Sequence, residues 1–177
     1  EVNYSLAVAK WRKKKPDASC KAQLSQVIRS NPAHFDALSL RAEVYAAEGD
    51  HTRAIADLKA AAKLAPQDLV LKLKLADELA QAPGQIDEAI QELDRIVQDW
   101  PESAMAKNNL AFYLLTFKSD RNSDALAYSL EAYKNNEANP TFQDTYAWAL
   151  YKTGEVDTAR DLLEAAVLIA KDVYPFY

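Results

Sequence analysis

Small residues recur along this chain at a nearly constant interval, and that interval constrains the fold more than any other feature. One series comprises Cys20, Ala54, Ala89, Ala125 and Ala159, which are separated by 34, 35, 36 and 34 residues. A second series comprises Ala42, Ala76, Ala111 and Ala147, which are separated by 34, 35 and 36 residues. Self-similarity at a period of this length indicates an array of one repeated supersecondary unit, each copy packing against its neighbours.

The period divides the chain into five repeats, and the apolar spacing inside each repeat predicts helices. The repeats are residues 1–34, 35–68, 69–103, 104–139 and 140–177. Apolar residues within a repeat lie three, four and seven apart, the spacing of an amphipathic helix. Each repeat is interrupted near its middle, at Pro16, Gly49, Pro83-Gly84, Lys118–Ser123 and Gly154. The sequence therefore predicts two helices per repeat and ten in all.

The two small series have a mechanical role in this arrangement. Small side chains let the two helices of a repeat approach closely, while larger residues fill the space between repeats. The position four residues after each member of the first series is leucine in four repeats and serine in repeat four: Leu24, Leu58, Leu93, Ser129 and Leu163. We expect the small residues, Cys20 included, to be buried, and Cys20 to act as a substitute for alanine rather than as a nucleophile.

Two stretches carry a resemblance to a known family. One runs from Arg41 through Gly49 and Ala54 to Pro66, and the other from Tyr146 through Gly154 and Ala159 to Ala166. Their pattern of small, glycine and proline positions resembles the tetratricopeptide repeat, and the match extends over the whole chain. Arg41 departs from it, because that position is usually apolar. The resemblance implies an all-α, right-handed α-solenoid of five helix-turn-helix units, a single array over residues 1–177, with a concave groove lined by the first helices.

Composition and charge exclude several classes of function. Residues 1–34 carry seven basic and two acidic side chains, whereas the remainder carries 14 and 24. The basic cluster Lys10–Lys15 is not accompanied by a recognition helix, and the rest of the chain is acidic, so we interpret the cluster as a solvated helix end and expect no nucleic-acid partner. No apolar run is long enough to span a membrane. The chain does not begin with methionine, and we expect it to be part of a longer protein.

Catalytic and metal-binding patterns are absent from the sequence. There is no glycine-rich phosphate loop, no His-Glu-x-x-His motif and no Gly-x-Ser-x-Gly turn. One cysteine and two histidines are too few for a zinc site of the usual ligand set. We therefore expect no enzymatic activity, no cofactor and no bound metal.

The resemblance places a candidate partner-binding site in the groove of repeats four and five. The residues expected to face that groove are Met105, Asn108, Asn109, Phe112, Leu115, Asp144, Trp148 and Tyr151. Exposed aromatic side chains would provide apolar contact area, and the two asparagine amides would bind the backbone of an extended peptide. In the alternative interpretation, Phe112 and Trp148 pack between adjacent helices.

These residues predict a protein–protein interaction scaffold that binds a peptide or helix of a partner. Two other functions remain open. Trp148 and Tyr151 could stack on sugar rings in a polysaccharide-binding, export-associated periplasmic module, or uncapped array ends could self-associate through Tyr174, Phe176 and Tyr177. Repeats four and five are similar to late repeats of bacterial proteins of envelope sorting and exopolysaccharide export, which favours a bacterial cell envelope or periplasmic location.

Overall fold

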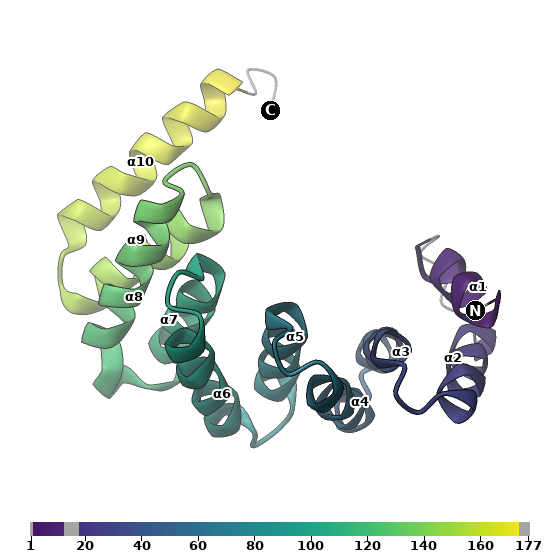
Figure 1. Cartoon of the computed structure of the whole chain (residues 1–177). Coiled ribbons are helices and arrows are strands. Elements are labelled where there is room, and N and C mark those ends of the chain that lie inside the picture. Colours follow the sequence, from purple (N-terminus) through teal and green to yellow (C-terminus); the bar gives the residue numbers. More distant parts are fainter. Residues whose placement is uncertain (1, 13–17, 174–177) are drawn as a thin grey trace. The chain divides into compact units, whose positions relative to one another are not determined.

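The computed structural model describes residues 2–12 and 18–173, and this part of the chain is helical (Figure 1). Its α-helices are α1 (Val2–Arg12), α2 (Ala18–Ser30), α3 (Phe35–Ala47), α4 (His51–Leu64), α5 (Leu69–Gln81), α6 (Ile86–Asp99), α7 (Ala104–Phe117), α8 (Asn122–Asn135), α9 (Pro140–Thr153) and α10 (Val156–Val173). The prediction of two helices per repeat is confirmed across these residues. The predicted break at Pro16 and the aromatic residues Tyr174, Phe176 and Tyr177 lie outside the described residues.

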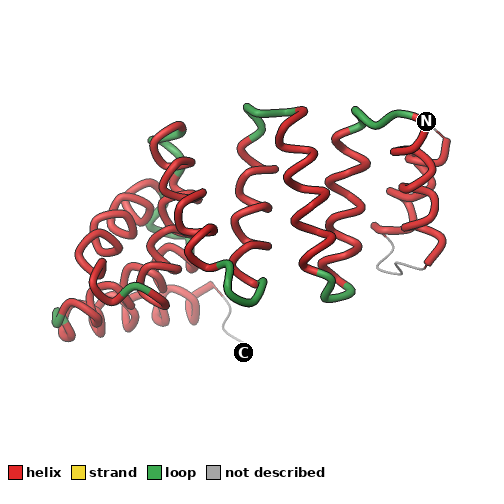
Figure 2. The backbone as a smooth tube through the Cα atoms, turned by 90° about the horizontal axis from the view of Figure 1, so that it is seen from below, coloured by secondary structure: helices red, strands yellow, loops and turns green. Residues whose placement is uncertain are grey.

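The helices form two compact regions, residues 1–92 and residues 93–177, and α6 contributes to both. Within each region, short turns connect successive helices (Figure 2). In the first region α3 packs on α4 and α4 on α5, and in the second α7 packs on α8, α8 on α9 and α9 on α10. α7 and α9, the first helices of repeats four and five, also contact each other. Each compact region is thus a stack of neighbouring helices, as expected for a repeat array.

Polar side chains cap the start of α3, α4, α5, α7 and α9. The side chains of His34, Asp50, Asp68, Ser103 and Asn139 each accept a hydrogen bond from a backbone N–H of the first helical turn. Such caps satisfy donors that have no partner inside the helix. The polar run Lys118–Ser123 contains a short 3₁₀ helix, Ser119–Arg121, before α8. Arg121 forms ion pairs with Asp94 of α6 and Asp124 of α8, which connects this turn to the helices around it.

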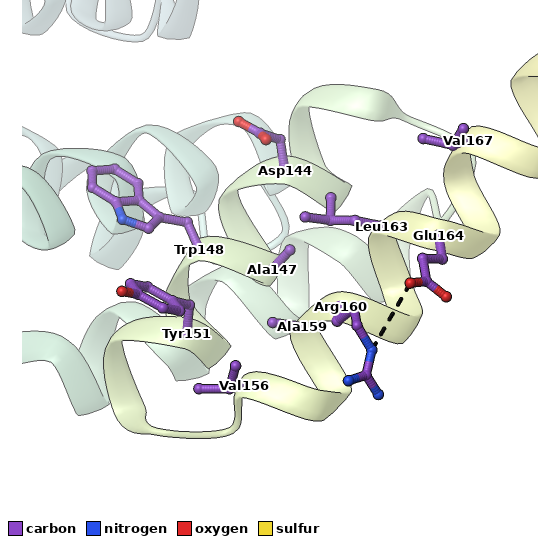
Figure 3. Close-up of a pocket in the computed structure, with 10 residues that line it drawn as sticks. All are labelled: Asp144, Ala147, Trp148, Tyr151, Val156, Ala159, Arg160, Leu163, Glu164 and Val167. Carbon is purple, nitrogen blue, oxygen red and sulfur yellow. Dashed lines mark ion pairs between the residues drawn. The ribbon is translucent and has the colours of Figure 1, made fainter.

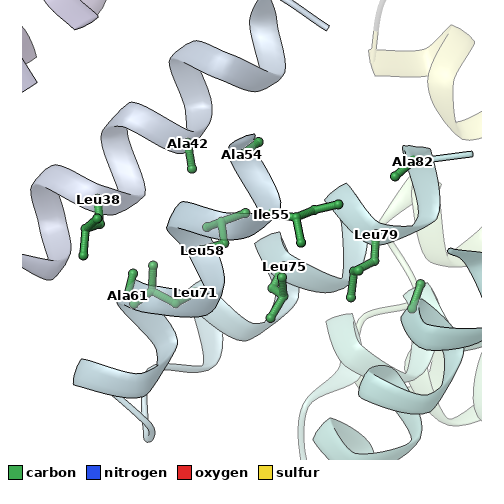
Figure 4. Packing of buried hydrophobic residues seen from close by; sticks show 11 residues of the cluster. Leu38, Ala42, Ala54, Ile55, Leu58, Ala61, Leu71, Leu75, Leu79 and Ala82 are labelled. Atoms are coloured by element: carbon green, nitrogen blue, oxygen red, sulfur yellow. The ribbon is translucent and has the colours of Figure 1, made fainter. Parts of the chain in front are cut away.

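The small residues are buried, as predicted. Every member of the two series is at most 5% exposed, and the Cys20 thiol lies 3.5 Å from the carbonyl oxygen of Ala7. The residues four positions after the first series are also buried in repeats one to four, but Leu163 in repeat five is 41% exposed. Figure 4 shows a hydrophobic core of the first compact region, in which side chains from α3, α4 and α5, among them Leu58, pack together.

The unusual Arg41 has a specific partner inside the repeat. Its Nε and Nη2 donate to the two carboxylate oxygens of Asp57, each at 2.7 Å, and its Nη1 donates to Ser25 Oγ at 3.1 Å. The hydrogen bonds to Asp57 raise the pKa of Arg41 above its ordinary value, so the side chain stays charged. This bidentate pair joins α3 to α4, with a further bond to α2, and it explains how a charged residue fits a position that is usually apolar.

Gly154 ends α9 in a conformation that other residues adopt at a cost. Its φ is +96°, and the next backbone N–H, from Glu155, donates to the carbonyl of Leu150 at 2.9 Å. A Cβ added at Gly154 would meet no atom within 4 Å, so the cost of substitution is backbone strain alone. We expect Gly154→Ala to lower the free energy of unfolding by about 1 kcal/mol, measured by urea denaturation. Gly154→Asn, which tolerates this conformation better, should lower it less; a larger loss with asparagine would contradict this account.

Candidate partner-binding site

Large apolar side chains lie exposed on α7 and α9. Met105 is 58% exposed, Phe112 43% and Tyr151 60%. Met105 and Phe112 are seven residues apart on α7, and Trp148 and Tyr151 are three apart on α9, so each pair lies on one face of its helix. We call Met105, Phe112, Trp148 and Tyr151 the aromatic surface.

The aromatic surface is partly ordered by its own contacts. The rings of Phe112 and Trp148 lie 5.7 Å apart between centroids and are tilted by 59°. The Nζ of Lys152 lies 5.8 Å from the centre of the Trp148 ring. Phe112 and Trp148 therefore pack against each other, as the alternative interpretation held, while Phe112 keeps enough exposed area to contact another molecule.

A pocket of about 930 Å³ opens beside this surface, between α9 and α10 (Figure 3). Its lining residues are Asp144, Ala147, Trp148, Tyr151, Val156, Ala159, Arg160, Leu163, Glu164 and Val167. Three of them, Asp144, Trp148 and Tyr151, belong to the site expected from the sequence. The α10 residues were not expected there, because the resemblance places only the first helix of each repeat in the groove.

Two of the expected site residues are buried instead of exposed. Asn108 is 4% exposed and Leu115 is 2% exposed, so the expectation that they face an open groove was wrong. The reason is that α7 buries side chains around much of its circumference: Ala106, Asn108, Leu110, Ala111, Leu114 and Leu115. The buried Oδ1 of Asn108 accepts no hydrogen bond from any described residue. Asn109 is half-buried.

The described residues offer no metal site and no spanning helix. Among them, no group of three or more His, Cys, Asp or Glu side chains is arranged to hold a metal ion. No helix in the described ranges is both long and apolar enough to cross a membrane. Both histidines have structural partners, since His34 caps α3 and His51 Nδ1 lies 3.0 Å from Glu78 Oε2.

Comparison with protein families identifies the class of this chain. Two tetratricopeptide repeat models match it, one over residues 4–68 and the other over residues 45–111. Together they span residues 4–111, and the chain belongs to the tetratricopeptide repeat family. No curated protein sequence matches it.

Solved structures with the same fold cover nearly the whole chain. MamA from Desulfovibrio magneticus RS-1 is 15% identical, with a TM-score of 0.83 over 97% of this chain and 94% of that one. The repeats of a Podosopora anserina putative kinesin light chain are 18% identical, with a TM-score of 0.76 over 98% and 95%. YrrB, described as a TPR protein with an unusual peptide-binding site, is 14% identical, with a TM-score of 0.73 over 99% and 86%. At these identities the likeness concerns the fold, and the predicted all-α solenoid class is confirmed.

Proposed function

We propose that this protein is a non-catalytic interaction scaffold that binds a peptide or helix of a partner protein on its aromatic surface. The observation that carries the proposal is the exposure of Phe112 and Tyr151: Tyr151 lines the 930 Å³ pocket, and Phe112 contacts Trp148, which also lines it. Contiguous exposed apolar area on a soluble chain is typical of an interaction site. The tetratricopeptide fold supports the general role, because proteins of this family bind protein or peptide partners.

The composition of the surface suits it to this task. Tyrosine and tryptophan supply large contact areas at a low cost in conformational entropy, and both are enriched among residues that dominate binding energy. The contact between Phe112 and Trp148 holds two of the rings before a partner arrives. Burying apolar area contributes about 25 cal/mol per Å². Asp144 and Lys152 provide charged groups at the edge, where an interface is usually polar.

Selection of peptides from a displayed random library against the intact chain would test the proposal. We expect selected peptides to lose affinity by about tenfold or more, or about 1.4 kcal/mol, when Phe112→Ala and Tyr151→Ala are combined. Dissociation constants would be measured by fluorescence polarisation. Phe117→Ala is the matched control, because Phe117 is a half-exposed aromatic residue at the end of the same helix.

Two outcomes would count against the proposal. The first is an equal loss of affinity in the Phe117 control, which would show that the effect is not local to the aromatic surface. The second is binding of oligosaccharides that depends on Tyr151 in a chain that selects no peptides, which would replace the peptide ligand with a sugar.

A further inference from the structure

The surface that α9 and α10 form in repeat five corresponds to the surface that α3 and α4 form in repeat two. The first is exposed at the pocket, whereas the second is covered by another helix. Leu163 occupies in repeat five the place that Leu58 occupies in repeat two, four residues after the small residue. Leu58 is 2% exposed, whereas Leu163 is 41% exposed and Val167, one turn further along α10, is 53% exposed. The difference is that another helix packs over Leu58.

The helix that packs over Leu58 is α5, the first helix of repeat three. Its side chains show which residue types fit the surface formed by α3 and α4. Its Leu71, Leu75 and Leu79, at positions i, i+4 and i+8, pack with Leu58 in the core of Figure 4. Lys74, at i+3, forms an ion pair with Glu43 of α3. An amphipathic helix with this spacing therefore closes the space over an α3–α4 pair.

The α9–α10 surface differs from the α3–α4 surface in ways that select a ligand. Glu43 and Ala46 of α3 correspond to Trp148 and Tyr151 of α9, because they follow the second small series by one and four residues. A cation at the place of Lys74 would therefore lie near the rings of Tyr151 and Trp148, which attract cations, and Lys152 Nζ already lies 5.8 Å from the centre of the Trp148 ring.

The charges around the pocket favour a basic ligand. Asp144 and Glu164 line it, and Asp157 and Asp161 lie close to it on α10. The one basic lining residue, Arg160, forms ion pairs with Asp157, Asp161 and Glu164, so its charge is already compensated. The remaining negative charge would attract a positively charged helix and repel an acidic one.

We propose that the α9–α10 pocket binds a basic amphipathic helix of another protein, with apolar residues at i, i+4 and i+8 and lysine or arginine at i+3. This inference rests on the proposed scaffold function and specifies the partner's chemistry. A second copy of this chain fits less well: in its first helix, the places of Leu71, Leu75 and Leu79 are taken by Asn3, Ala7 and Trp11. Only Trp11 is large and apolar, so α1 cannot fill the pocket as α5 would.

The probe for the test is a synthetic peptide of residues 68–82, which contains α5. An isolated helix of this length is marginal in water, so a covalent link between positions 70 and 77 should hold it helical. The peptide carries Glu78→Lys, because Glu78 pairs with His51 in the chain and α10 has Val156 at the corresponding place. Isothermal titration of the full chain with this peptide measures the stoichiometry and the dissociation constant.

We expect saturable binding at one site. Leu163→Glu should raise the dissociation constant about tenfold or more, because the substitution puts a carboxylate among the apolar contacts. Val70→Glu in the protein is the matched control, since Val70 is an exposed apolar residue on α5, and it should leave binding unchanged. In the peptide, Leu75→Asp should abolish binding and Lys74→Glu should weaken it about threefold or more. Circular dichroism checks that the variants remain folded.

Several results would overturn the inference. One is the absence of saturable binding, and another is binding that Leu163→Glu leaves unchanged. Light scattering that shows a concentration-dependent oligomer, lost in Leu163→Glu, would assign the surface to a second copy. Binding that strengthens about tenfold when residues 174–177 are deleted would assign it to the end of this chain. If the probe fails while display-selected peptides still depend on Phe112 and Tyr151, the inference falls and the scaffold function stands.

Discussion

Leu58→Ala should lower the free energy of unfolding of this protein by about 3 kcal/mol. Leu58 is among the largest fully enclosed side chains of the first compact region, with α3 and α5 packed around it. Removing its terminal carbons loses the favourable free energy of transferring their apolar surface out of water, and it leaves a cavity. The surrounding helices can fill that cavity only in part, because their own side chains are closely packed.

The repeat supplies a matched control for this substitution. Leu163→Ala makes the same chemical change at the corresponding place of repeat five, where the side chain is 41% exposed, and it should cost about 1 kcal/mol or less. Urea denaturation followed by far-ultraviolet circular dichroism measures both. Because repeat arrays can unfold region by region, amide exchange in α4 and α10 should show where each effect lies. Equal losses in the two variants would contradict the packing described for Leu58.

Asp57→Ala should be the most damaging change to a polar residue in the first compact region, with a loss of about 3 kcal/mol in the free energy of unfolding. The substitution removes the carboxylate that receives two hydrogen bonds from Arg41. The Arg41 side chain is 18% exposed and would be left largely out of water without its counter-charge. Thermal and urea denaturation, monitored by circular dichroism, measure the loss.

Two further variants distinguish the loss of the Arg41–Asp57 ion pair from the general effect of removing a carboxylate. In Arg41→Leu with Asp57→Ala, neither charge is left unpaired, so most of the lost stability should return. Glu88→Ala removes the carboxylate of an ion pair with Lys59, in which the lysine side chain is 45% exposed and the glutamate side chain 49%. Because the pair is exposed, this substitution should lower the free energy of unfolding by only about 0.5 kcal/mol. A double variant less stable than Asp57→Ala alone would show that the Arg41 stem contributes mainly by packing.

The sequence predicted the helical scaffold well because its signals are local. A glycine ends α9 at Gly154, and acidic Asp50 begins α4, each acting within one helical turn. The polar run Lys118–Ser123 was predicted only as a break. Its 3₁₀ helix and the ion pair between Arg121 and Asp94 were not predicted, since the two residues are 27 positions apart and the contact depends on where the 3₁₀ helix lies relative to α6.

The candidate site was predicted less completely, because exposure is a property of neighbouring helices. Phe112 and Tyr151 are exposed as expected, but Leu115 and Asn108 are buried around α7. The sequence assigns a leucine to the same place in repeats two and five, and nothing in its local pattern distinguishes Leu58 from Leu163. The amino-acid pattern by itself determined the period, the helices and the small residues between them. Only the tertiary structure decided which faces stay open, because a side chain is buried when another helix packs over it.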